Sequence, residues 1–383
     1  MQYVVTNFAY GTGPYLRTTE LALALNRERE SQGRERLGII VPWVYDGKQR
    51  RIMLEEFGVH ERVHPAEILL DAALGKILKK VFYGENTYQE ALRHWVDEFG
   101  DASRAAHAHL TGECALETLR GEARTVRGDD IVLELARAPR IRYGVAPVYS
   151  VTFGYISEIL EEALRAPDAD VASPRDLMRG ALALAKELEE EAVFHGLTEP
   201  GTFSYRENRT PRYRVEQSIP PTITPPQPNT ESIAEGIYVT ITGIPGLERL
   251  YAEAERLGLK LYSNDPAAVP GSEYLSPHMI PNVAIKLQFA RSGWGSVWLS
   301  QLSGTPFVTP VFDPLDDPEI YFNNICIEKL GLGIVYRGES LKDILAAAER
   351  LRPGIAERTQ ELRTRFGTLD GNQYAARIIS EKT

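Results

Sequence analysis

The sequence predicts an α/β protein of two domains, each with helices on both faces of a mostly parallel sheet. Three observations support this fold class. The chain has 383 residues, more than a single hydrophobic core usually organises. Strand–loop–helix–strand patterns typical of βαβ units begin near residues 2 and 236. A proline-rich stretch separates the two patterns, which places a domain boundary between them.

The composition is that of an ordinary globular protein, with 43% hydrophobic and 25% charged residues. A net charge of −10 argues against a general nucleic-acid binder, which needs a basic surface. Cys114 and Cys326 lie far apart in the chain, so we expect neither a disulfide framework nor a cysteine metal site. No apolar run is long enough to span a membrane, and the first residues lack a signal-peptide pattern. We therefore expect a cytoplasmic protein.

The first domain is predicted over residues 1–217. It starts with a buried strand over residues 2–6, a glycine-rich loop over 7–15, a helix over 18–29 and a second strand over 37–42. The later elements of this domain are predicted as mostly helix over 66–119, strands over 130–135 and 148–152, and a helix over 173–194. This alternation predicts a doubly wound sheet.

Residues 218–230 contain five prolines and form neither a helix nor a central strand in this prediction. We interpret them as a connector to the second domain, over residues 231–383. That domain opens with a strand over residues 236–242, a loop, a helix over 247–257 and a strand over 259–263. The last helix, near residues 373–379, is a candidate to cross back to the first domain.

A glycine-bearing turn, a short helix and a buried strand follow one another over residues 290–310. Gly293 and Gly295 let the backbone approach a ligand closely, and Ser292 and Ser296 can cap the helix and donate hydroxyls. Arg291 adds a cation beside them. Because the first N–H groups of a helix carry the positive end of its dipole, this pattern predicts an anion site, most naturally for a diphosphate.

Five short segments also resemble the donor-sugar box of GT-B glycosyltransferases: residues 291–297, 303–306, Pro310, 317–323 and 327–333. The similarity is greatest to the peptidoglycan N-acetylglucosaminyltransferase that makes lipid II, then to the UDP-glucuronosyl and plant natural-product transferases. The resemblance implies two Rossmann-like domains facing each other across a cleft. A UDP-, GDP- or TDP-sugar would bind to the C-terminal domain and an acceptor to the N-terminal one.

The resemblance also assigns roles to individual donor-site residues. Gly243 lies in a loop similar to a second diphosphate-facing loop, which is otherwise a plain strand-to-helix connection. Glu319 matches a glutamine position that holds the sugar, and Asn323 matches the asparagine that ends the same donor-binding motif. Capping of a helix by Asp316 or Asp317 explains the same acidic segment. Ile320 and Leu299 replace a glutamine and a ribose-binding glutamate of the relatives.

Those two replacements have consequences for the donor. We expect the sugar to differ from N-acetylglucosamine. Ser300 or Gln301 is expected to replace the ribose contact, unless the nucleotide is held differently.

The loop after the first strand resembles the acceptor loop of the same enzymes through Gly11, Gly13, Tyr15 and Arg17. The alternative is a plain strand-to-helix turn. Pro14 stands where many relatives have the histidine that removes the acceptor proton. That departure calls for another general base.

Glu134, an acid inside an apolar strand, is the first candidate for this catalytic base because burial would raise its pKa. The competing interpretation is an ion pair with Arg137 or Arg140. His107 and His109 are second candidates, and both also fit ordinary surface histidines.

A short helix with lysines flanking Ile77, Leu78, Val81 and Phe82 has a basic amphipathic face. Such a face either packs against the core or makes peripheral contact with an anionic membrane.

The function that the resemblance implies is an inverting, metal-independent glycosyl transfer that needs no cofactor besides the sugar-nucleotide substrate. The missing histidine leaves open a GT-B-like protein that binds a sugar nucleotide or a partner without catalysis. A nucleotide-sugar 2-epimerase is a further alternative, but the acids and histidines that it needs in the cleft have no evident place in the sequence.

Overall fold

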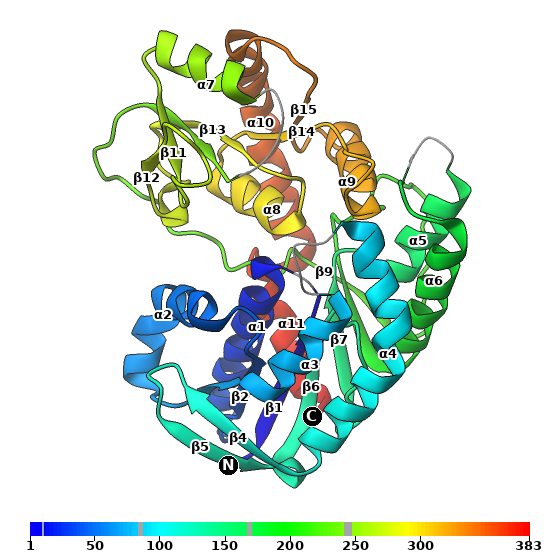
Figure 1. Ribbon diagram of the computed structural model, residues 1–383. Coiled ribbons are helices and arrows are strands. Elements are labelled where there is room, and N and C mark those ends of the chain that lie inside the picture. Colours follow the sequence, from blue (N-terminus) through cyan, green and yellow to red (C-terminus); the bar gives the residue numbers. More distant parts are fainter. Residues whose placement is uncertain (10, 83–86, 167–170, 241–246) are drawn as a thin grey trace. The chain divides into compact units, whose positions relative to one another are not determined.

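The computed structural model describes residues 1–9, 11–82, 87–166, 171–240 and 247–383 (Figure 1). Contacts divide the chain into two compact units. Unit 1 comprises Met1–Thr198, Thr210–Thr222 and Asn372–Thr383, and unit 2 comprises Glu199–Arg209 and Ile223–Gly371. This division differs from the boundaries expected over residues 218–230, because the chain enters unit 2, returns to unit 1 and then enters unit 2 again.

Unit 1 contains a nine-stranded sheet in the order β5-β4-β3-β2-β1-β6-β7-β8-β9. Its strands are β1 (Tyr3–Phe8), β2 (Gly38–Pro42), β3 (Ile68–Asp71), β4 (Glu113–Thr118), β5 (Ala123–Arg127), β6 (Ile131–Arg137), β7 (Val148–Thr152), β8 (Ala192–Thr198) and β9 (Glu216–Ile219). The seven strands β3, β2, β1, β6, β7, β8 and β9 are neighbours in this order and run parallel. The other two, β4 and β5, form a hairpin at the β3 edge, where β4 pairs antiparallel with β3. The prediction of mostly helix over residues 66–119 misses β3 and β4, and the helix predicted to residue 194 ends before β8.

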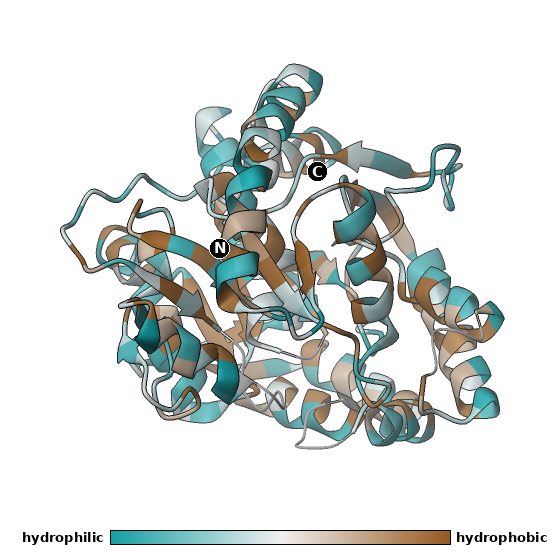
Figure 2. Cartoon of the chain, turned by 90° about the horizontal axis from the view of Figure 1, so that it is seen from above, coloured by the Kyte–Doolittle hydropathy of each residue, from teal (hydrophilic) through white to brown (hydrophobic). Residues whose placement is uncertain are grey.

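The helices of unit 1 cover this sheet (Figure 1). They are α1 (Thr12–Ser31), α2 (Asp46–Val63), α3 (Ala72–Phe82), α4 (Tyr88–Leu110), α5 (Ile156–Arg165), α6 (Arg175–Glu190) and α11 (Gly371–Lys382), with a 3₁₀ turn at Gly128–Asp130. In Figure 2 the helices carry both apolar and polar stretches, as expected for helices that bury one side. Helix α11 returns to unit 1, where Arg34 donates to the carbonyl of Ser380 at 2.9 Å.

Unit 2 contains a parallel six-stranded sheet in the order β12-β11-β10-β13-β14-β15. Its strands are β10 (Gly236–Val239), β11 (Lys260–Ser263), β12 (Glu273–Tyr274), β13 (Ile285–Phe289), β14 (Phe307–Pro310) and β15 (Ile334–Tyr336). Its helices are α7 (Leu247–Arg256), α8 (Trp294–Ser303), α9 (Pro318–Lys329) and α10 (Leu341–Phe366), with a 3₁₀ turn at Pro277–Met279. Both predicted βαβ openings, and with them the α/β fold class with two parallel sheets, are confirmed.

Helix α3 buries part of its apolar face in unit 1. Leu78 and Val81 are fully buried, Ile77 is partly buried, and the side chain of Phe82 lies outside the described residues. The lysines remain at the surface because the helix packs its apolar side into the core. The predicted membrane contact is therefore wrong for Leu78 and Val81. No helix in the described part of the chain is both long and apolar enough to cross a bilayer.

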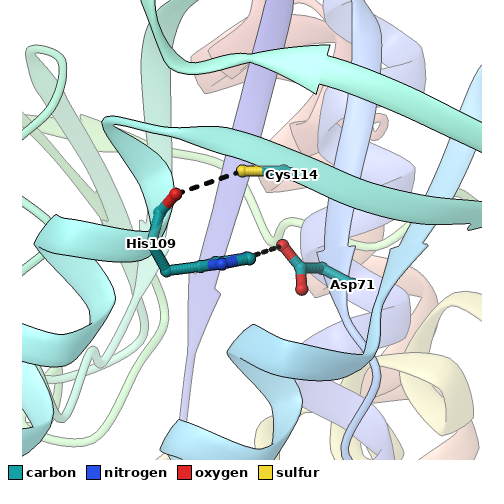
Figure 3. Close-up of side chains that lie close together, drawn as sticks. All are labelled: Asp71, His109 and Cys114. Carbon is teal, nitrogen blue, oxygen red and sulfur yellow. Dashed lines mark hydrogen bonds and ion pairs between the residues drawn. The ribbon is translucent and has the colours of Figure 1, made fainter.

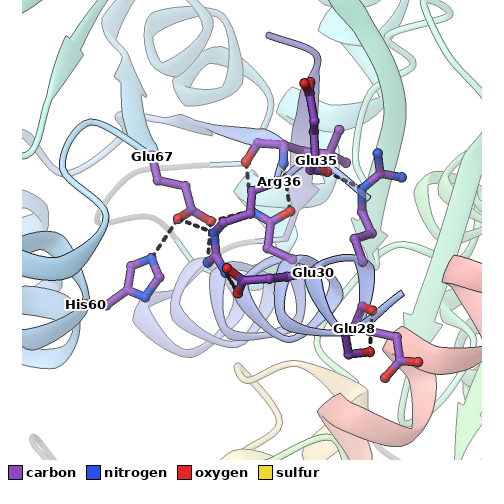
Figure 4. Close-up of polar contacts among 10 residues, drawn as sticks. Glu28, Glu30, Glu35, Arg36, His60 and Glu67 are labelled. Atoms are coloured by element: carbon purple, nitrogen blue, oxygen red, sulfur yellow. Dashed lines mark hydrogen bonds and ion pairs between the residues drawn. The ribbon is translucent and has the colours of Figure 1, made fainter. Parts of the chain in front are cut away.

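A buried carboxylate joins the start of β3 to helices α1 and α2 (Figure 4). Glu67 is 3% exposed and receives hydrogen bonds from the Arg36 guanidinium at 2.9 and 3.1 Å and from Asn26. His60 Nε2 lies 3.0 Å from the same carboxylate. These hydrogen bonds lower the pKa of Glu67 against the effect of its burial. The Glu67 carboxylate, with its charge paired in this way, has a structural role in unit 1.

Replacing Thr87 by alanine is expected to lower the free energy of unfolding by about 1 kcal/mol. Thr87 caps α4 by accepting a hydrogen bond from the Glu90 backbone, and the Glu90 carboxylate accepts one from the Thr87 backbone. Urea unfolding measures the change, and Thr87→Ser, which keeps the hydroxyl, is the control. Equal losses in both variants would contradict a capping role.

Candidate functional site

The predicted anion site lies in unit 2, where β13 leads into α8. Gly293 is the N-cap residue of α8, no side chain caps this end, and the first turn carries no acidic residue. Ser292, expected as a cap, is instead buried, with its hydroxyl 3.5 Å from the carbonyl of Ile320. At the start of α8, therefore, no capping side chain accepts a hydrogen bond from the backbone N–H groups, and no acidic side chain offsets the positive end of the helix dipole.

The two glycines of this turn face open space. A Cβ atom placed on Gly293 or Gly295 would meet no heavy atom within 4 Å beyond the adjoining backbone. Gly293 has φ of −66°, so its backbone suits any residue. Because the backbone conformation of Gly293 does not require glycine, we attribute the two glycines to the open space that they leave in front of the helix start.

The second predicted donor segment lies against the same turn. Asn323 donates to the carbonyl of Ser292 at 2.8 Å, and Arg291 forms an ion pair with Asp316. Asp317 caps α9 by accepting from the Glu319 backbone at 2.9 Å, as the capping interpretation of this segment expects. Residues 291–296 and 317–323, apart in sequence, are thus neighbours in unit 2.

Burial separates the residues that can contact a ligand from those that hold the turn. Asn323 is fully buried, and its amide, which also lies 3.2 Å from Glu319 Oε1, holds the turn in place, while its Oδ1 has no hydrogen-bond partner among the described residues. Glu319 and Ser296 are partly exposed, and Arg291 is exposed. Gly243 lies outside the described residues.

The expected replacements for the ribose contact are engaged inside unit 2. Leu299 packs against an apolar cluster that includes Tyr238 and Ile280. The Ser300 hydroxyl donates to the carbonyl of Thr305 at 2.6 Å. Gln301 donates to the carbonyl of Leu332 at 2.7 Å and accepts from Arg358. Neither Ser300 nor Gln301 is therefore free to bind a ribose.

Residues 200–203, which the sequence does not single out, contact helices α8 and α9. The indole N–H of Trp294 donates to Thr202 at 3.1 Å, and that of Trp298 donates to the carbonyl of Pro200 at 3.1 Å. The ring of Phe203 packs 5.1 Å from that of Phe322 in α9. Two tryptophans in one short helix are the only sequence signal of this contact, because buried indoles need hydrogen-bond acceptors.

The acceptor loop predicted after β1 forms the start of α1 in unit 1. Gly11 is its N-cap residue with φ of 110°, and the Gly11 N–H donates to the Tyr45 hydroxyl at 2.9 Å. Tyr15 is fully buried, whereas the acceptor contact predicted for it needs an accessible ring. Arg17 forms an ion pair with Glu20, and Gly13 is exposed.

Glu134, the first candidate base, lies inside β6 and is 2% exposed. Its Oε1 accepts a hydrogen bond from the Asn7 amide at 2.9 Å, in place of the arginine that the ion-pair interpretation expects. Burial raises the pKa of Glu134 to about 8, more than the Asn7 hydrogen bond lowers it. The carboxyl is therefore mostly protonated at pH 7 and gains its charge only in alkaline solution.

The second candidates, His107 and His109, lie in the last turn of α4. His107 Nδ1 is 2.9 Å from the carbonyl of Tyr143. His109 Nε2 is 2.8 Å from Asp71 Oδ2 at the end of β3 (Figure 3). This hydrogen bond raises the pKa of His109 to about 10, so the ring is a cation at neutral pH. Ligand atoms of Asp71, His109 and Cys114 lie within 4.8 Å of one another, a set that could hold a metal ion.

Comparisons with known proteins identify the fold. No family model matches the chain, and no curated protein matches it by sequence. The calicheamicin glycosyltransferase CalG4 is similar in structure over 100% of this chain and 98% of its own, at 15% identity and a TM-score of 0.55.

Two further solved structures show the same likeness. UGT2 of Phytolacca americana, complexed with UDP-2fluoro-glucose and pterostilbene, is 11% identical with a TM-score of 0.59, covering 100% of this chain and 99% of its own. LpCGTa in complex with UDP is 13% identical with a TM-score of 0.60, covering 99% of both chains. The chain therefore has the GT-B fold of glycosyltransferases.

Proposed function

We propose that the start of α8 binds the diphosphate of a sugar nucleotide and that the protein transfers this sugar to an acceptor hydroxyl. The observation that carries the proposal is the uncapped helix start, open in front of Gly293 and Gly295, with residues 317–323 seated beside it. Helix N-termini of this kind bind phosphate groups through backbone N–H donors. The structural neighbours, some of them bound to UDP or a UDP-sugar, support the same assignment.

In this proposal the acceptor oxygen attacks the anomeric carbon as the bond to the diphosphate breaks, so the configuration inverts. The α8 N–H groups stabilise the negative charge that develops on the leaving diphosphate. The acceptor proton passes to a base. Glu134 stays the first candidate, which requires that turnover rises with pH through about 8. His107 is the second, because the protonated ring of His109 cannot accept a proton at neutral pH.

A thermal-shift panel of UDP, GDP and TDP and their sugars tests the donor site in the full chain. A ligand that binds only the folded state stabilises it by about 2.7 kcal/mol at one hundred times its dissociation constant. A rise in melting temperature with one nucleotide supports the proposal. No shift with any of them at millimolar concentration would overturn it, and binding without turnover would favour the catalytically inactive alternative.

Replacing Glu319 by alanine is expected to weaken binding of a sugar nucleotide about tenfold and to leave the bare diphosphate nucleotide unchanged. The partly exposed carboxylate accepts hydrogen bonds, and only the sugar offers hydroxyls to it. Glu328→Ala, on the same helix but paired with Arg337, is the matched control. Equal losses for both ligands would place Glu319 outside the sugar site.

A further inference from the structure

The end of β6 lies at the topological switch point of the unit 1 sheet. Strand β1 pairs with β2 on one side and with β6 on the other, and the chain winds away from β1 in both directions. In open α/β sheets, ligands bind outside the carboxyl ends of the strands at this point. The last residue of β6 is Arg137, which is level with Phe8 at the end of β1.

Arg137 is a buried cation without an acidic partner in the described part of the chain. It is 8% exposed, and Nη2 donates to the hydroxyl of Thr222 at 2.9 Å. The guanidinium lies 5.7 Å from the ring centre of Phe153, and its Nε has no hydrogen-bond acceptor among the described residues. Buried arginines are almost always paired with a carboxylate, because an unpaired buried charge costs several kcal/mol.

The charges around Arg137 come from Arg17 and from the glutamates that act on Arg17. Arg17 lies near it, and Glu20, which pairs with Arg17, is the acid acting on both. Glu56 also acts on Arg17, so these two arginines and two glutamates balance in charge, and Glu20 and Glu56 do not pair directly with Arg137. Burial, followed by the charge of Arg17, lowers the pKa of Arg137 to about 10, which still keeps the side chain charged at neutral pH.

The start of α1 adds a second source of positive potential. This helix has 20 residues, no side-chain cap at Gly11 and no acidic residue in its first turn. The Ala9 N–H donates to the Arg137 carbonyl at 3.1 Å, so the helix begins a few residues from Arg137. The Gly11 N–H already donates to the Tyr45 hydroxyl, so the N–H groups that follow it and the Arg137 guanidinium are the donors available to an anion.

We propose that Arg137 and the start of α1 bind an anionic group, a carboxylate or a phosphate, carried by the acceptor molecule. The assignment to an acceptor rests on the proposed glycosyl transfer, whereas the anion site itself does not. A carboxylate or phosphate offers the guanidinium the paired acceptors that Thr222 and Phe153 lack. The acceptor class is thus a hydroxyl compound that also bears a negative charge.

Isothermal titration of the full chain tests this site with two pairs of probes, in excess UDP so that phosphate at α8 does not interfere. One pair is 4-hydroxybenzoate and 4-hydroxybenzamide, and the other is 4-hydroxyphenyl phosphate and hydroquinone. We expect the charged member of one pair to bind and Arg137→Met to weaken it about 30-fold or more, with the neutral member unaffected. Which pair responds distinguishes carboxylate from phosphate.

Arg142→Met is the matched control, because this arginine lies in the loop after β6 and is paired with Glu187 and Glu191. Equal losses in both variants, equal affinity for charged and neutral probes, or no binding by either charged probe would overturn the site. A loss of UDP affinity in Arg137→Met would assign the cation to the donor instead. If UDP fails to bind but the charged probe depends on Arg137, the proposed transfer fails and the anion site stands.

The melting temperature of the ligand-free protein separates binding from a purely structural role. Arg137→Met removes a buried unpaired charge, so we expect a rise of about 2 to 4 °C. A fall would show that Arg137 stabilises unit 1 through Thr222 and Phe153, and would contradict the proposal.

Discussion

Replacing Gly293 by valine is expected to weaken UDP binding at least about 100-fold while leaving the protein folded. The valine side chain would fill the open space before α8, where a methyl group meets no heavy atom within 4 Å. A diphosphate kept from the helix start loses two or more hydrogen bonds between its charge and the backbone N–H groups. Each such bond contributes about 1.5 to 3 kcal/mol, and 1.4 kcal/mol corresponds to a tenfold change in affinity.

Titration calorimetry with UDP measures this loss, and the melting temperature without ligand reports on folding. Gly58→Val is the matched control, because Gly58 in α2 also has open space around its Cα and no left-handed backbone. Retained UDP affinity in Gly293→Val would place the diphosphate elsewhere.

Replacing Glu134 by glutamine is expected to stabilise unit 1 by about 3 kcal/mol at pH 8 and to change little at pH 5. The folded pKa of about 8 lies above the ordinary value of 4.5, so the folded state binds the proton more tightly than the unfolded state. The associated stability is complete below pH 4.5 and is lost as the pH rises through about 8. At 1.36 kcal/mol per pKa unit, the loss between pH 5 and pH 8 is about 3 kcal/mol.

Glutamine has no such proton to lose. Its amide reproduces the neutral acid, with one oxygen to accept from Asn7 and one donor group, and Asn7 Oδ1 is without a partner among the described residues. Hydrogen exchange of the β1 and β6 amides in urea, measured at both pH values, follows unit 1 within the full chain. Glu122→Gln, at an exposed acid of the same unit, is the control.

A parallel pH dependence in wild type and Glu134→Gln would mean that the carboxyl is already charged at pH 5. Turnover of the same variant decides the catalytic prediction. A fall of about two orders of magnitude with UDP binding kept would assign the base to Glu134. Unchanged turnover would move the search to His107, because His109 is already protonated at neutral pH.

Local sequence patterns predicted the elements that carry the candidate donor site. Residues 290–310 form a turn, α8 and β14 as expected, because a glycine turn, a run of helix-forming residues and a β-branched run each act over a few neighbouring residues. The antiparallel strand β4 was missed. Its alternating pattern is short and follows a long helix, and its pairing with β3 is a contact over more than forty residues of sequence.

The sequence by itself determined the two parallel sheets, the helix start before which Gly293 and Gly295 lie, and the acidic segment that caps α9. Only the tertiary structure decided where individual side chains point. It buried Tyr15, turned Asn323 toward Ser292, gave Glu134 an amide partner and left Arg137 without a carboxylate among the described residues. Hydrophobic spacing predicts which face of an element is buried, whereas the partner of a buried polar group comes from elements distant in sequence, which only folding brings together.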